Sequence, residues 1–163
     1  MKLKKYHYVL IAVAIIFIMV VSFGGKSDYY EKYKNYEYAF FPHYSTINNK
    51  LSEKDKEIAD SIIHQATLVF NFTGERKPEK DVGALERYYF TDPEIQISKV
   101  DLKIKPIAGK FNNTGGYLWV VYSVERTDNT GEIVNGSWDI PCRWEAEKQK
   151  DGNWKVVDID EPA

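Results

Sequence analysis

An uncharged, strongly apolar stretch at positions 6–25 constrains this chain more than any other feature of its sequence. As a helix, this stretch would be ~30 Å long, which matches the hydrocarbon core of a bilayer. Three lysines precede it, and by the positive-inside rule they place the N-terminus in the cytoplasm and the rest of the chain outside. The sequence therefore predicts a retained signal anchor that contacts membrane lipid through residues 8–23.

This stretch has two other interpretations. Cleavage near Gly24, in the sequence Ser22-Phe23-Gly24 where Phe23 lies between two small residues, would turn it into a signal peptide and release a secreted domain. A buried helix of a soluble domain fits poorly, because the stretch is apolar on all sides and flanked by lysines. Lipoprotein processing is excluded, since the only cysteine is Cys142, far from the apolar run.

Charge and cysteine content limit what the exported part can be. From Lys26 onward the chain has 19 basic and 24 acidic residues, a net charge of about −5. With no basic stripe, this charge argues against nucleic-acid binding. A single cysteine cannot form an internal disulfide, so stability must come from a hydrophobic core. Lysine outnumbers arginine 18 to 4, which is typical of an AT-rich bacterial genome.

The chain divides into three parts: residues 1–25 as cytoplasmic tip and anchor, 26–50 as an aromatic juxtamembrane segment, and 51–163 as the extracytoplasmic domain. In the second part, aromatic residues at positions 29, 33, 36 and 40 follow helical spacing and predict a short amphipathic helix. Their rings would lie at the membrane–water interface, cap the core of the domain, or stack on carbohydrate.

The third part begins with the clearest helix signal. Ser52 and Asp55 match a capping box, in which each side chain bonds the other residue's backbone N–H group. Apolar residues then recur at spacings of three and four, which predicts an amphipathic helix over 53–71. A short helix is expected over 82–90, and Asp92-Pro93 marks a turn.

After that turn, the apolar period changes to alternation and predicts four strands. The first carries a bulge near Ser98-Lys99 and is followed by a loop over 109–116. The second, 117–126, is apolar on both faces and should be central. The third should be an edge strand or bulged at Pro141. One of its faces is expected to hold five residues: Trp138, Ile140, Cys142, Trp144 and Ala146. A turn at 151–152 leads to the last strand, 154–159.

The ending over 151–159, DGNWKVVDI, resembles the final strand of the NTF2-like (cystatin-like α+β cone) superfamily, where Gly-x-Trp-Lys-Val/Ile follows a tight turn. The stretch 136–148 is similar to the long penultimate strand of that fold. The specific part of the resemblance covers about 25 residues, and many small membrane-anchored proteins of Gram-positive bacteria look alike here. The resemblance implies an α+β fold in which helices pack on a curved antiparallel sheet around a conical pocket, but it implies no particular reaction.

No local motif for catalysis or metal binding is present in the sequence. The three histidines are scattered, and there is no phosphate loop, nucleophile elbow or cysteine pair. We therefore expect no metal and no cofactor. Cys142 lies on an apolar strand face, which favours a buried, unreactive thiol over a nucleophile.

The resemblance implies that a catalytic member would use a carboxylate or histidine inside the cone. The nearest candidates here are Asp139, Glu125 and Asp158, with Tyr117 and Tyr122 as hydrogen-bond donors. Strand alternation argues against Asp139, because it falls on the polar, solvated face. If a ligand pocket exists, its walls should include four aromatic residues, which could equally form the core: Trp119, Tyr122, Trp138 and Trp144.

The sequence favours a non-catalytic binding or assembly module at the cell envelope, acting as a homodimer or with another envelope protein. Two alternatives remain open. One is an isomerase- or dehydratase-like enzyme with a carboxylate in the cone pocket. The other is a binder of cell wall or carbohydrate that uses exposed tyrosine and tryptophan.

Overall fold

The computed structural model describes residues 28–40, 42–74 and 77–162. The predicted signal anchor and its lipid-contacting residues lie outside these ranges. Among the helices that are described, none is long and apolar enough to cross a membrane.

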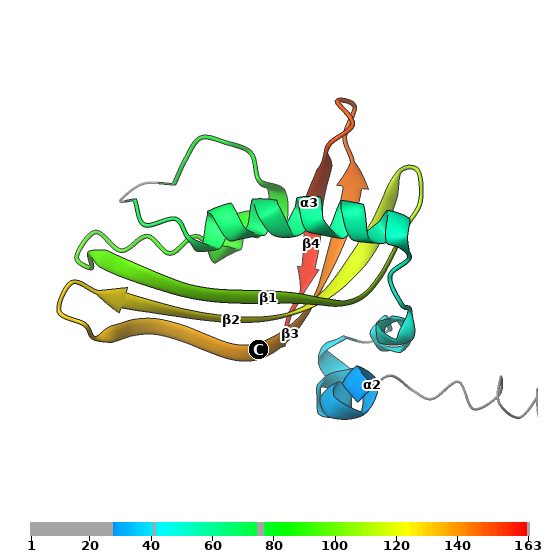
Figure 1. Cartoon of the computed structure of the whole chain (residues 1–163), viewed down its shortest axis with the longest axis horizontal. Coiled ribbons are helices and arrows are strands. Elements are labelled where there is room, and N and C mark those ends of the chain that lie inside the picture. Colours follow the sequence, from blue (N-terminus) through cyan, green and yellow to red (C-terminus); the bar gives the residue numbers. More distant parts are fainter. Residues whose placement is uncertain (1–27, 41, 75–76, 163) are drawn as a thin grey trace, which may run out of the picture.

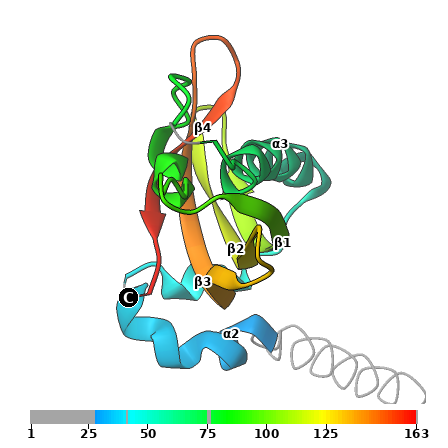
Figure 2. The same cartoon turned by 90° about the vertical axis from the view of Figure 1, so that its left-hand side faces the viewer.

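A curved sheet of four antiparallel strands forms the centre of the fold (Figure 1). The strands are β1 (Ile97–Phe111), β2 (Gly115–Asp128), β3 (Ile133–Lys148) and β4 (Trp154–Asp160), and they lie in the order of the chain. Helix α3 (Glu53–Phe70) lies along one face of the sheet, and α2 (Asp28–Tyr33) lies on the opposite side (Figure 2). The described chain is thus an α+β structure with a curved antiparallel sheet, as the sequence predicts.

The start of α3 is fixed by the capping box that the sequence indicates. Ser52 Oγ accepts a hydrogen bond from the Asp55 N–H at 3.2 Å, and Asp55 Oδ2 accepts one from the Ser52 N–H at 3.3 Å. Asp55 also accepts a hydrogen bond from the Phe111 N–H at 3.1 Å, at the end of β1. Burial raises the pKa of Asp55, but the hydrogen bonds from Ser52 and Phe111 outweigh burial and keep it below its usual range. The charged cap therefore also ties the helix to the sheet.

The main hydrophobic core lies between α3, the 3₁₀ helix η3 (Gly83–Tyr88) and the sheet. Burying each large apolar side chain stabilises the fold by roughly 1.5–3 kcal/mol. Among the side chains less than 2% exposed are Ile62, Phe70, Leu85, Val120 and Trp144.

A second, smaller core covers the opposite face of the sheet. It is built by α2, by the 3₁₀ helix η2 (Tyr44–Asn48) and by Phe40, which follows the 3₁₀ helix η1 (Lys34–Ala39). Trp119 is fully buried there, meets Phe40 edge-on at 4.7 Å and donates a hydrogen bond to Thr46 Oγ1 at 2.8 Å. Tyr33 and Tyr44 are buried in the same cluster. These rings of the aromatic segment therefore cap the sheet, which confirms one of the three interpretations for them.

The predicted loop over 109–116 is wrong. β1 continues to Phe111 and β2 begins at Gly115, so the connection is much shorter. Gly116 pairs with Phe111 across the two strands, and a Cβ on it would lie 2.4 Å from the Lys110 carbonyl oxygen. Glycine here permits a close approach within the sheet, whereas the sequence pattern reads as a loop.

The expected placement of Trp138 on the face of Ile140 and Cys142 is also wrong. Tyr122 pairs with Ile140 and Val124 with Ser137, so two residues of β3 oppose one of β2. This bulge includes Asp139, the one non-glycine residue of the described chain with positive φ, at 53°. Because an extra residue reverses the alternation, Trp138 turns to the other face and is 57% exposed.

The remaining strand predictions are confirmed. A register shift lies between Ile97 and Lys99, and β2 is buried on both faces between β1 and β3. Pro141 lies next to the bulge. The pairing of β3 with β4 starts only at Arg143, two residues after Pro141 in the chain. The missing N–H group of Pro141 therefore faces no neighbouring strand on that side.

Ser52→Ala should lower the free energy of unfolding by about 1 kcal/mol, because α3 loses the acceptor at its N-terminus. Ser61→Ala, on the exposed side of the same helix, is the matched control and should leave stability unchanged or slightly higher. Urea unfolding of the full chain measures both. Equal stability of the two variants would contradict the role of the cap.

Cys142 is fully buried, and burial raises the pKa of its thiol above the usual range. The folded chain should therefore react slowly with a thiol reagent at about pH 8, where an ordinary thiol is partly ionised, and react fast after unfolding in guanidinium. A Ser61→Cys variant should show one additional thiol that reacts at once. Rapid labelling of Cys142 in the folded chain would contradict its burial.

Candidate functional site

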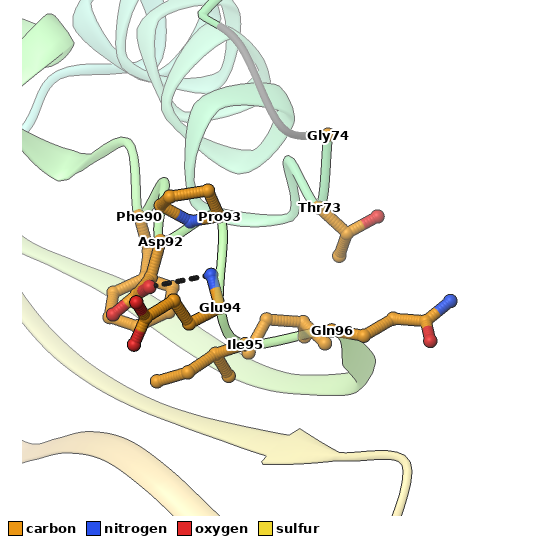
Figure 3. A pocket seen from close by; sticks show the side chains of 9 residues that line it. Thr73, Gly74, Phe90, Asp92, Pro93, Glu94, Ile95 and Gln96 are labelled. Carbon is orange, nitrogen blue, oxygen red and sulfur yellow. Dashed lines mark hydrogen bonds between the residues drawn. The ribbon is translucent and has the colours of Figure 1, made fainter.

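One pocket, of about 410 Å³, lies between the segment after α3 and the loop that leads into β1. Figure 3 shows that its lining comes mainly from this loop, whose Asp92 accepts a hydrogen bond from the Glu94 N–H at 2.9 Å. No polar side chain in its lining is buried. Within the described residues, no group of three histidine, cysteine or acidic side chains could hold a metal ion. This pocket offers little chemistry for recognition.

A second pocket, about 260 Å³, has a different character. It lies where α3 and η3 end above β2 and β3, on the side of the main core. Charged and polar groups line it together with aromatic rings. Its lining includes Phe70, Arg87, Tyr88, Tyr89, Phe90, Tyr122, Val124, Arg126, Asn135, Ser137 and Glu161.

Three aromatic rings form the floor of this pocket. Phe70 stacks on Tyr88 with ring centroids 4.4 Å apart, and both rings contact Tyr122, at 5.1 and 5.5 Å. The rings come from α3, η3 and β2, so the site depends on the packing of all three elements. Such packed rings have little freedom to move, which gives the pocket a fixed shape.

A polar network starts at Glu161, which follows β4. Tyr88 Oη donates to Glu161 Oε2 at 2.9 Å, and Tyr122 Oη donates to Oε1 at 2.5 Å. Below them, Trp144 Nε1 donates to Tyr88 Oη at 3.2 Å, and Cys142 Sγ lies 3.2 Å from the same oxygen. Burial, followed by the neighbouring acidic groups, raises the pKa of both tyrosines above the usual range. Both hydroxyls therefore stay neutral and act as donors.

Arg126 closes the other part of the pocket and is only 3% exposed. Its NH2 group donates to the carbonyl oxygens of Phe70 and Tyr88, at 3.0 and 3.2 Å, where α3 and η3 end. Its NH1 group donates to Asn135 Oδ1 at 2.7 Å. The guanidinium thus satisfies carbonyl groups that helix ends leave without partners, and it fixes both helices to β2.

The site residues expected from the sequence are distributed over both faces of the sheet. Tyr122 lines the pocket, and Trp144 lies beneath it in the core. Trp119 belongs to the opposite core, and Trp138 is exposed, so neither lies beside Tyr122. Tyr117 also packs against the opposite core.

The three candidate carboxylates also lie away from this pocket, and Asp158 is exposed on β4. Glu125 accepts a hydrogen bond from Trp138 Nε1 at 2.6 Å on an exposed part of the sheet. Asp139 forms an exposed ion pair with Lys32 at 3.6 Å. It lines another pocket, of about 280 Å³, between α2 and the sheet. In the pocket beside Tyr122, the carboxylate is that of Glu161.

Sequence reasoning missed Arg126, Tyr88 and Glu161. Arg126 continues the alternation of the core-facing side of β2, two residues after Val124, so an arginine in phase with an apolar face was a usable signal. Tyr88 and Glu161 lie in a 3₁₀ helix and after the last strand, where side-chain direction follows no simple period. No sequence pattern could have brought them together.

Comparison of the chain with protein-family models, with curated proteins and with solved structures found no match.

Proposed function

We propose that this chain is a membrane-anchored, extracytoplasmic binding module that holds a small ligand in the pocket beside Tyr122. The observation that carries the proposal is the content of this pocket. The pocket has a volume of about 260 Å³ and is lined by a buried guanidinium, two neutral tyrosine hydroxyls and three packed aromatic rings. A few convergent polar groups on an aromatic wall are typical of ligand sites. The volume suits a molecule smaller than most drugs.

The position of the pocket supports this proposal. The NTF2-like resemblance implies a cavity between the helices and the curved sheet, and this pocket lies between α3, η3 and the sheet. The segment nearest the proposed anchor, α2, packs on the other face of the sheet (Figure 2). An anchor before Asp28 would therefore leave the pocket open to the outside. A second copy or another envelope protein could respond to the ligand.

Binding is favoured over catalysis by the state of the reactive groups. Both oxygens of Glu161 accept tyrosine hydroxyls, and Cys142 is fully buried with a raised thiol pKa. Two of the roughly four acceptor sites of the Glu161 carboxylate are thus already engaged, which leaves it less available as a general base for a substrate proton.

An isomerase-like enzyme is the second candidate, and in it Glu161 would take the role that the sequence assigns to Asp139 or Glu125. It is favoured by one observation, the pairing of a pocket carboxylate with two hydroxyl donors. The carbohydrate-binding alternative would instead use exposed Trp138.

Small fluorinated aromatic compounds, of neutral, anionic and cationic kinds, test the proposed pocket by fluorine NMR on the full chain in lipid nanodiscs. Ser137→Trp places a large ring in the pocket and should weaken the binding of any true ligand by roughly tenfold or more, through steric exclusion. Ser61→Trp, on the exposed side of α3, is the matched control and should bind as the native chain does.

The proposal fails if no compound binds the native chain, or if Ser137→Trp binds as tightly as the control. Binding that survives Ser137→Trp but is lost on substitution of Trp138 would favour the carbohydrate-type surface instead.

A further inference from the structure

Arg126 differs from the other buried arginine of the described chain in what surrounds its charge. Arg143 is 4% exposed, and its NH1 group lies 2.6 Å from Glu145 Oε1 and 3.5 Å from Asp160 Oδ2. Arg126 is 3% exposed, yet no carboxylate of the described residues forms an ion pair with it. Its hydrogen-bond acceptors are two carbonyl oxygens and one amide oxygen. The same fold therefore pairs one buried guanidinium with carboxylates and leaves the other without a counter-ion.

An uncompensated buried charge is destabilising, because removal from water costs several kcal/mol per ion. Burial accordingly lowers the pKa of Arg126. Its Nε atom, like that of Arg143, is buried and has no hydrogen-bond partner, so the missing counter-ion is what distinguishes Arg126. The side chain thus carries both a charge without a counter-ion and an unused donor, next to an open pocket.

The rest of the pocket fits a negatively charged, planar guest. Arg87 adds a second cation to its lining, and Glu161 is the one carboxylate there. Glu161 is already held by two tyrosine hydroxyls, which donate to both of its oxygens. The rings of Phe70 and Phe90 lie 6.0 and 5.4 Å from the Arg126 guanidinium, where they could face a flat ligand. In a domain with a net negative charge, this pocket is locally cationic.

We propose that the pocket binds a small organic anion, a carboxylate on a planar apolar body, with Arg126 as its counter-ion. This inference rests on the proposed function and names its ligand class. The carboxylate supplies the missing negative charge and an acceptor for the guanidinium, and the body packs on Phe70, Tyr88 and Tyr122. Guanidinium and carboxylate match in planarity and charge, which is why arginine is the usual partner of such groups.

An isosteric pair of probes separates charge from shape. para-Fluorobenzoate and para-fluorobenzamide are nearly identical in size, and fluorine NMR reports the binding of each to the full chain in nanodiscs. The benzoate should bind roughly tenfold more tightly than the benzamide, as expected when a hydrogen bond gains a charge. Inorganic phosphate is added as a competitor, and it should displace the benzoate only weakly because it lacks the apolar body.

An internal counter-ion provides the matched variant. Asn135 Oδ1 already accepts from Arg126 at 2.7 Å, so Asn135→Asp keeps the acceptor and adds the negative charge that the ligand would supply. This variant should lose at least roughly tenfold in benzoate affinity, keep its benzamide affinity, and unfold at a higher temperature than the native chain without ligand. Asn113→Asp, in the exposed turn after β1, adds the same charge elsewhere and should change none of these.

The outcomes distinguish this inference from the proposed function. If benzoate and benzamide bind equally and Ser137→Trp abolishes both, the ligand pocket stands and the anion is excluded. If neither probe binds while another compound of the wider set does, the ligand pocket stands and the carboxylate inference fails. If inorganic phosphate displaces para-fluorobenzoate at low concentration, the inference of a carboxylate ligand is wrong and a phosphate ligand is favoured. If Asn135→Asp binds benzoate as tightly as the native chain does, Arg126 is not the counter-ion of the ligand, even if the native chain prefers benzoate to benzamide.

Discussion

The burial of β2 on both faces is the constraint on which the rest of this structure depends. Trp119 needs a cover on one face, and Val120 and Tyr122 need one on the other, so the sheet must be enclosed by two layers. The aromatic segment 28–48 supplies the first layer, and α3 with η3 supplies the second. A helix of 18 residues is ~27 Å long, whereas a strand of 14 residues spans ~47 Å. The helix therefore ends before the strand does.

The candidate site lies where α3 and η3 end and no longer cover the core face of β2. Beyond Phe70, the core face of β2 continues to Arg126, and a cationic side chain takes the place of an apolar one. Arg126 binds the carbonyl groups at the ends of α3 and η3, so it completes the fold at the point where the pocket opens. The guanidinium satisfies the carbonyl groups at both helix ends, and because these acceptors are neutral, its charge has no counter-ion among the described residues. In the proposed function, the same guanidinium would therefore serve both the fold and the recognition of a ligand.

Much of the fold could be predicted from the sequence, because local patterns determine it. The capping box at Ser52, the stripe on α3, the two-sided β2 and the turn at Gly152 all follow from short-range spacing. The site could be predicted only in part. Tyr122 was expected in a pocket, but its partners were not, because Tyr88 and Glu161 are 34 and 39 residues away along the chain. The bulge at Asp139 interrupts the alternation of side chains along β3, so Trp138 lies on the other face of the sheet.

The sequence by itself determined the α+β class, the strand order of the hairpins and the side of β2 that each residue faces, since these depend on periods of two and 3.6 residues and on turn chemistry. Only the tertiary structure decided which residues meet at the pocket. Only the tertiary structure, too, leaves Arg126 buried without a carboxylate and Arg143 buried with two. Both arginines lie on strands, but Arg126 is in phase with apolar residues of β2, whereas Arg143 is in phase with Glu145 and Glu147 of β3. The energy of each buried charge depends on its removal from water and on the groups that folding brings to it, and the second of these is decided by the tertiary structure.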